Sequence, residues 1–201
     1  MMVKICGITN PEDALAAVAG GASAVGFNFY PASPRYIEPE LAARISEALP
    51  PAVLRVGVFV NAPREVIFRI QEIAGIHVAQ LHGDEAPDTV PKGIRVWKAL
   101  RVNGGFGSAS MEPYKVEAFL LDAPSDVYGG SGRIFDWSKA CGARHRIVLA
   151  GGLDESNVGE AIRLVRPWGV DACSRLESAP GRKDHTRLAS FLKAALAEEA
   201  R

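Results

Sequence analysis

The chain has 201 residues, 48% of them hydrophobic, and its 23 basic side chains balance 23 acidic ones. This length and hydrophobic content predict a single domain over residues 1–201 with a substantial core. The zero formal charge argues against an extended nucleic-acid interface, and the sequence has no run of 18 apolar residues that would predict a membrane span. Three cysteines without metal-ligand spacing, and the lack of a secretory leader pattern, favour a reducing cytoplasm.

Apolar segments of strand length alternate along the chain with segments of helical periodicity. Strands are predicted at residues 3–6, 24–29, 54–60, 78–82, 96–100, 118–122, 147–150 and 170–173. Helices are predicted at residues 13–19, 39–49, 64–74, 155–165 and 188–198, with a short one after Trp137. The glycine- and serine-rich stretch 102–111 predicts a degenerate helix after the fifth strand, and residues 129–132 predict a flexible loop.

Strands that read as continuous apolar runs are buried on both faces, as in a parallel sheet. Eight of them, nearly all separated by helices, predict a single-domain (β/α)₈ barrel with short loops. The alternative is an open doubly wound sheet. It is disfavoured because Gly7, after the first strand, is not part of a G-x-G-x-x-G pattern.

In such a barrel the active site lies at the carboxyl ends of the strands, so polar residues there are the candidates. Cys6 ends the first strand, and as a thiolate it could act as a general base; it could equally be a small buried hydrophobic residue. Asp122 ends the sixth strand, where desolvation favours a protonated acid; an ion-paired or capping carboxylate is the alternative.

Three further positions could hold a substrate. Arg35 lies in a loop stiffened by two prolines and could grip a carboxylate at two points, or be an exposed loop residue. His82 could orient a substrate or satisfy a local hydrogen bond. Gly151 and Gly152 follow the seventh strand and precede a predicted helix, which suits a phosphate, although glycine pairs are also ordinary turns.

Taken together, the motifs resemble those of the phosphoribosylanthranilate isomerase family, over essentially the whole chain. They are Val3 to Thr9, Gly26 to Tyr30 with Ser33 to Ile37, Val56 to Asn61, Gln80 to Gly83, Leu120 to Asp122, Gly129 to Gly132 with Phe135 to Trp137, Ala150 to Leu153, and a final set of Asp171, Ser174, Glu177 and Pro180 to Asp184. The opening seven residues and the Gln-Leu-His-Gly block are the most specific.

The resemblance implies an enzyme of tryptophan biosynthesis that needs no metal or cofactor. It would convert N-(5-phosphoribosyl)anthranilate to 1-(2-carboxyphenylamino)-1-deoxyribulose 5-phosphate by an Amadori rearrangement. By the same resemblance, Asp122 is the general acid and Cys6 the general base, and Arg35 holds the anthranilate carboxylate. His82 lies near the substrate, and the phosphate is held by backbone groups at Gly151, Gly152 and Ser174.

One position departs from the family pattern. After the eighth strand the family usually reads Asp-Val-Ser-Ser-Gly-Val-Glu, whereas Arg175 stands here in place of the glycine. If that position has a positive φ, arginine costs about 1–2 kcal/mol. We expect Arg175 to be tolerated and to contact or flank the phosphate.

Two other functions compete with the isomerase. A related phosphate-binding barrel, such as a sugar-phosphate epimerase or indole-glycerol-phosphate synthase, would be expected to carry metal ligands or a catalytic lysine at strand ends, and Lys98 is the one competitor. A barrel that binds phosphoribosyl ligands without catalysis is the other. The sequence leaves open whether the protein is a monomer or a homodimer.

The first strand also makes a structural prediction. Alternation points Lys4 to the same face as Cys6, into the barrel, where an unpaired ammonium is costly. Barrel closure sets the eighth strand beside the first, so Asp171 is the predicted partner of Lys4.

Overall fold

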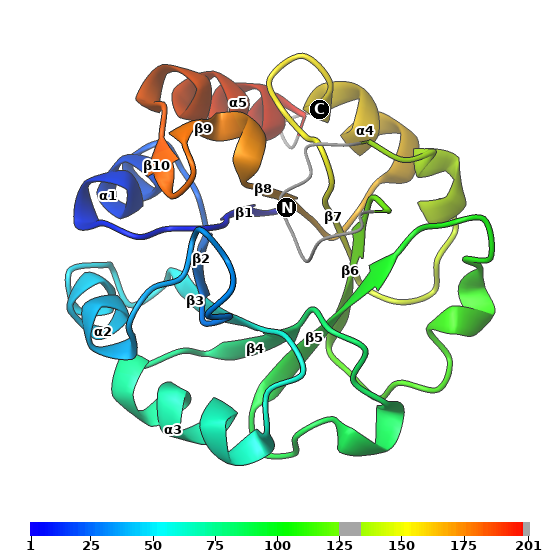
Figure 1. The fold of residues 1–201 in the computed structure, drawn as a ribbon. Coiled ribbons are helices and arrows are strands. Elements are labelled where there is room, and N and C mark those ends of the chain that lie inside the picture. The colour runs from blue at the N-terminus through cyan, green and yellow to red at the C-terminus, as the bar shows by residue number, and fades with distance from the viewer. Residues whose placement is uncertain (125–133, 199–201) are drawn as a thin grey trace.

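The strands close on themselves in chain order, each pairing in parallel with the next, and the eighth pairs with the first (Figure 1). The computed structural model describes residues 1–124 and 134–198. The barrel strands are β1 (Met2–Ile5), β2 (Ala24–Asn28), β3 (Leu54–Phe59), β4 (Val78–Leu81), β5 (Arg95–Arg101), β6 (Ala118–Asp122), β7 (Ile147–Leu149) and β8 (Gly169–Ala172). The prediction of a (β/α)₈ barrel is therefore confirmed.

Helices form an outer ring around these strands (Figure 1). The α-helices are α1 (Pro11–Ala19), α2 (Pro39–Glu47), α3 (Arg64–Ala74), α4 (Val158–Val165) and α5 (His185–Ala197). Short 3₁₀ helices are η1 (Pro87–Thr89), η2 (Ser108–Ser110), η3 (Trp137–Ala140) and η4 (Ser174–Leu176), and a hairpin of β9 (Glu177–Ala179) and β10 (Arg182–Lys183) follows β8. No helix within residues 1–124 and 134–198 is both long and apolar enough to cross a membrane.

The connections match the predictions in part. The degenerate helix after β5 is confirmed, since that connection holds only η2. The connection between β4 and β5 likewise holds only a short 3₁₀ helix, η1. Pro87, Pro91 and Gly93 lie in this connection and disfavour a longer helix. The predicted loop at residues 129–132 lies outside the described residues.

Helix ends follow local capping chemistry. Asn10 accepts a hydrogen bond from the Asp13 amide at 2.8 Å and Pro11 begins α1. Asp184 caps α5 through the amides of Thr186 and Arg187, so that this helix begins at His185, earlier than predicted. The helix after β7 begins later than predicted, at Val158, because an Asp154 turn precedes it.

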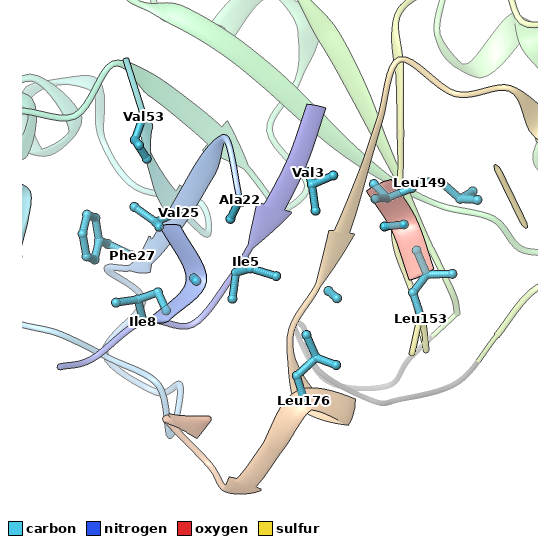
Figure 2. Close-up of a cluster of buried hydrophobic side chains, with 14 of the residues drawn as sticks. Val3, Ile5, Ile8, Ala22, Val25, Phe27, Val53, Leu149, Leu153 and Leu176 are labelled. Atoms are coloured by element: carbon cyan, nitrogen blue, oxygen red, sulfur yellow. The ribbon is translucent and has the colours of Figure 1, made fainter. Parts of the chain in front are cut away.

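The hydrophobic core has two layers, one on each face of the strands. Outward side chains such as Val3, Ile5, Val25 and Phe27 pack under the helices (Figure 2). Inward side chains fill the barrel itself, from Met2, Ala24, Val56, Val78, Trp97, Ala99, Ala118, Leu120, Val148 and Ala150. Because neighbouring residues of a strand alternate between these layers, the inward positions of β1 after Met2 are Lys4 and then Cys6.

The predicted pairing of Lys4 with Asp171 is confirmed. The two residues are register partners across the β1–β8 seam, and Lys4 Nζ lies 2.9 Å from Asp171 Oδ1 with both residues buried. Burial lowers the pKa of Lys4, but the charge of Asp171 and the neighbouring Cys6 sulfur more than offset this and raise it above its ordinary value. The ammonium therefore stays charged inside the barrel.

We expect Asp171→Asn to lower the free energy of unfolding by roughly 3 kcal/mol, because it leaves the Lys4 charge buried without a counter-ion. Urea denaturation followed by circular dichroism measures the change. The exposed Asp88 provides the matched control, Asp88→Asn, which should change stability little. Equal stability of Asp171→Asn and the wild-type protein would show that the seam does not depend on this charge.

Candidate active site

One pocket lies at the carboxyl ends of the barrel strands and gathers every residue that the sequence predicted for the site. The predicted residues among its lining are Cys6, Arg35, His82, Asp122, Gly151, Gly152, Ser174 and Arg175. They come from the ends of β1, β4, β6, β7 and β8 and from the loop after β2. The lining also includes Asn28, Gln80, Asp171 and Cys173.

Cys6 follows β1 directly, and its amide donates to the Ala172 carbonyl at 2.9 Å, continuing the β1–β8 ladder. A hydrogen bond with Cys173, and then the charge of Lys4 below it, lower the pKa of the Cys6 thiol well below its ordinary value against the opposing effect of burial. The arrangement therefore favours a thiolate, the form in which a cysteine accepts a proton.

Asp122 ends β6 and is half-buried at the pocket wall. Its Oδ1 accepts a hydrogen bond from the Ala123 amide at 2.8 Å, and its Oδ2 lies 3.4 Å from His82 Nε2. The Gln80 amide nitrogen lies 3.2 Å from His82 Nδ1. An amide N–H donated to Nδ1 places the ring proton on Nε2, so that His82 presents an N–H to the Asp122 carboxyl.

Arg35 is held by a carboxylate that the sequence reasoning did not assign to it. Its Nε and Nη2 donate to Glu177 at 2.9 and 2.7 Å, and Lys183 Nζ donates to the same carboxylate at 3.0 Å. The guanidinium is therefore fixed rather than exposed. Its Nη1 makes no hydrogen bond with a residue in the described part of the chain, and Arg35 faces the pocket.

The glycine pair after β7 forms a tight backbone turn beside Asp122. Both glycines have a positive φ, 82° for Gly151 and 62° for Gly152, a conformation that favours glycine. A Cβ on Gly151 would lie 2.8 Å from the Ala123 amide nitrogen and 2.9 Å from Asp122 Oδ1. The helix predicted to begin at residue 155 begins only at Val158, so the glycine pair lies farther from its N-terminus than predicted.

Ser174 and Arg175 open the 3₁₀ helix η4 beside this turn. Arg175 is not among the described non-glycine residues of positive φ, so the strain considered for this position does not arise. Its Nη1 donates to Asp154 Oδ2 at 2.8 Å, which ties the loop after β8 to the loop after β7.

Lys98, the competing catalytic lysine, points to the other face of its strand. Its Nζ donates to the Gly83 carbonyl at 2.8 Å and to Glu85 Oε2 at 2.9 Å. It does not contribute to the pocket that contains Cys6 and Asp122. Within the described ranges, no group of three or more His, Cys, Asp and Glu side chains is placed to hold a metal ion.

Several functional contacts were missed by sequence reasoning. Glu177 and Lys183 were noted only as family motif residues, and Gln80 was noted only as part of the Gln-Leu-His-Gly block. The signal for Glu177 was available in principle, because an arginine beneath a proline-stiffened loop needs a carboxylate partner. The hairpin of β9 and β10, which brings Lys183 to Glu177, was not predicted.

Comparison with known proteins identifies the family of the chain. Residues 3–194 match the family model described as N-(5'phosphoribosyl)anthranilate (PRA) isomerase. The chain belongs to the phosphoribosylanthranilate isomerase family. It is 52% identical over 198 residues to the N-(5'-phosphoribosyl)anthranilate isomerase of Solibacter usitatus, covering 98% of each chain.

Solved structures of this isomerase family share the fold over nearly the full length. The phosphoribosyl anthranilate isomerase of Thermus thermophilus superposes with a TM-score of 0.91 at 40% identity, covering 98% of this chain and 99% of its own. A family structure in complex with reduced 1-(o-carboxyphenylamino)-1-deoxyribulose 5-phosphate has a TM-score of 0.84 at 42% identity, with the same coverage. Another neighbour is a structure of monomers generated from the dimeric phosphoribosylanthranilate isomerase of Thermotoga maritima, with a TM-score of 0.83, 42% identity and again the same coverage.

The contacts of Glu177 generate a pH-dependent stability prediction. Burial raises its pKa, but the hydrogen bonds from Arg35 and the charge of Lys183 outweigh this and hold the pKa below its ordinary value. A carboxyl whose pKa is lower in the folded state stabilises the fold fully above its unfolded pKa, about 4.3, and loses that contribution as the pH falls through the folded pKa.

We therefore expect Glu177→Gln to reduce the free energy of unfolding by about 1–3 kcal/mol at pH 7, and the difference from wild type to shrink below about pH 4. Urea titrations at several pH values measure both quantities. Glu72→Gln, at an exposed position of α3, is the control and should give a small difference at every pH. A Glu177→Gln effect that grew on acidification would contradict the assigned sign.

Proposed function

We propose that the protein converts N-(5-phosphoribosyl)anthranilate to 1-(2-carboxyphenylamino)-1-deoxyribulose 5-phosphate by a cofactor-independent Amadori rearrangement in tryptophan biosynthesis. The observation that carries the proposal is that one pocket holds a thiol favoured as thiolate, Cys6, and a separate carboxyl, Asp122. Membership of the family, and the product analogue bound by a structural neighbour, support the same reaction.

The reaction needs an acid and a base on different atoms of the sugar. Asp122 gives its proton to the ribose ring oxygen, the C1–O bond breaks, and the nitrogen lone pair forms a protonated imine at C1. The Cys6 thiolate then removes the proton from C2, and the resulting enolamine rearranges to the aminoketone. The sequence is redox-neutral overall, and each positioned group contributes roughly 10²- to 10⁴-fold to the rate.

His82 and Gln80 support the acid. The Nε2 proton of His82 faces Asp122 Oδ2, and the Gln80 amide holds the opposite ring nitrogen. An imidazole N–H directed at the carboxyl stabilises the carboxylate left after proton transfer. His82 is thus a positioning residue beside the acid, with Gln80 behind it.

The anthranilate carboxylate is assigned to Arg35. A free guanidinium grips a carboxylate at two points, but Glu177 already occupies the Nε–Nη2 edge of this one. The substrate therefore meets the Nη1 side, and Glu177 keeps that side turned toward the pocket. Lys183 shares the Glu177 charge, so that the carboxylate does not cancel the attraction of Arg35 for the anion.

The phosphate end is assigned to the loops after β7 and β8. The amides at Gly151 and Gly152 are unobstructed by side chains, and Ser174 lies with them in the pocket lining. Arg175, held by Asp154, adds a positive charge at the same place. Anchoring both charged ends of the substrate supplies the orientation that positions C2 against Cys6.

No observation favours the competing functions. A synthase-type lysine is lacking from the pocket lining, because Lys98 faces the outside of the barrel. A non-catalytic binding barrel would not need the acid and base that this pocket contains.

The proposed location is the cytoplasm, and the proposed partner is a small-molecule substrate. The proposed assembly is a monomer or a homodimer.

Loss of phosphoribosylanthranilate fluorescence follows the reaction directly. We expect Cys6→Ala and Asp122→Asn each to lower kcat/KM by roughly 10²- to 10⁴-fold, since each removes one proton-transfer group. Cys141→Ala, at an exposed cysteine outside the pocket, is the matched control and should match wild type. Wild-type rates for either active-site variant, with the fold verified by circular dichroism, would refute that residue's role.

Arg175 is tested by its effect on KM. We expect Arg175→Gly to raise KM roughly two- to fivefold, the size of a half-exposed charge contact, with a smaller effect on kcat. Arg175→Ala removes the same charge without adding backbone freedom, so both variants should behave alike. A lower KM in Arg175→Gly would mean that the arginine obstructs the phosphate site.

A further inference from the structure

Two of the three cysteines leave adjacent strands at the same level of the barrel. The parallel register of β1 and β8 runs from Met2 opposite Gly169 to Ile5 opposite Ala172, so Cys6 and Cys173 are the next pair. The Cys6 amide still donates to the Ala172 carbonyl at this point. Neighbouring strands lie about 4.8 Å apart, within the Cα separation of about 4.4–6.8 Å that a disulfide spans.

The two side chains also point the same way. Lys4 and Asp171, two residues earlier on each strand, face each other inside the barrel, and alternation carries the next pair to the same face. Both cysteines line the pocket, both are free thiols, and the interaction between the two side chains lowers the pKa of Cys6. The register and the shared pocket therefore place the two sulfurs on the same side of the seam, open to a small solute that enters the pocket.

Cations surround the pair on two sides. Lys4 lies beneath Cys6, and Lys183 Nζ lies 3.9 Å from the Cys173 sulfur, where it also donates to the Cys173 carbonyl at 3.2 Å. A thiolate next to a cation is the form of cysteine that peroxides oxidise. Cys6 has the lowered pKa of the pair, so it is the sulfur that reacts first.

We propose that Cys6 and Cys173 are a peroxide-sensitive dithiol whose closure to a disulfide reversibly switches off the active site. The loss of activity rests on the proposed function, in which Cys6 is the base; disulfide formation does not. A hydroxyl in place of the Cys173 thiol would offer Cys6 the same hydrogen bond but no second sulfur. Cys173 therefore adds a redox step that the isomerisation itself does not need.

The oxidation is balanced with hydrogen peroxide as the oxidant. The Cys6 thiolate attacks one peroxide oxygen, an S–O bond forms, the O–O bond breaks, and the departing hydroxide takes up a proton as water. The Cys173 thiol then attacks the Cys6 sulfur, the S–S bond forms and the S–O bond breaks. The proton released by Cys173 goes to the departing hydroxyl group, which leaves as a second water. Two thiols lose two electrons in total and the peroxide gains them. Excess dithiothreitol reverses the change by thiol–disulfide exchange.

The test treats the reduced, full-length protein with hydrogen peroxide and then measures three quantities. Peptide mass mapping detects a linked pair of peptides that contain Cys6 and Cys173, two hydrogens lighter than their sum. Thiol titration of the denatured protein counts the remaining free cysteines. The fluorescence assay measures activity before oxidation, after it, and after dithiothreitol.

We expect the linked peptide, a single remaining free thiol, and a loss of activity of roughly 10²-fold or more, restored by dithiothreitol. Cys141→Ser should respond like wild type, because the exposed Cys141 lies outside the pair. Cys173→Ser should give no linked peptide, and at high peroxide its loss of activity should become irreversible, because Cys6 then has no resolving thiol and oxidises further.

Two results would overturn the proposal. One is the lack of a Cys6–Cys173 link in wild type under peroxide that oxidises Cys6. The other is a linked protein that stays active. The activity of the Cys6→Ala variant shows which claim has failed. If this variant is inactive, Cys6 remains the proposed base and only the disulfide switch is refuted. If it is fully active, Cys6 is not the base, and the proposed function fails together with the switch.

Discussion

The buried ion pair of Lys4 and Asp171 closes the barrel and sets the chemistry above it. It bridges β1 and β8, the first and last strands, and so fixes the seam on which the register of the ring depends. Two charges inside a barrel are costly unless they meet in good geometry, and here the register places them opposite each other. The next inward residue above Lys4 is Cys6, so the same ammonium that closes the fold also stabilises the thiolate.

Above this pair, charges of alternating sign follow the seam to the rim of the pocket. In order from the interior, they belong to Asp171, Lys4, Cys6, Lys183, Glu177 and Arg35. Each ion has a neighbour of opposite charge, which lowers the cost of holding so many ionised groups in a partly buried site. Arg35 ends the series at the pocket wall, and under the proposed function the anthranilate carboxylate is the anion that follows it.

The sequence was sufficient for those features that depend on local pattern. Continuous apolar strands, their alternation with helices and the level of each strand end predicted the barrel, the Lys4–Asp171 pair and the residues that line the pocket. Contacts made across loops were not predictable in this way. Arg35 and Glu177 are 142 residues apart, and nothing in the periodicity of either segment specifies that the β9–β10 hairpin folds over the loop after β2. The late start of α4 has a local cause instead, because the Asp154 turn replaces helical hydrogen bonds with side-chain ones.

The pocket places Cys6 and Asp122, the proposed base and acid, in different surroundings. Cys6 lies over Lys4 and beside Cys173, which favours the charged sulfur, whereas Asp122 faces His82, whose ring takes its Nδ1 hydrogen bond from Gln80 and thus offers an N–H. The two groups therefore lie in electrostatically different surroundings within one pocket. Under the proposed mechanism, the cations that favour Cys6 as a base also favour its reaction as a thiolate, and the proposed switch uses Cys173 as the second sulfur.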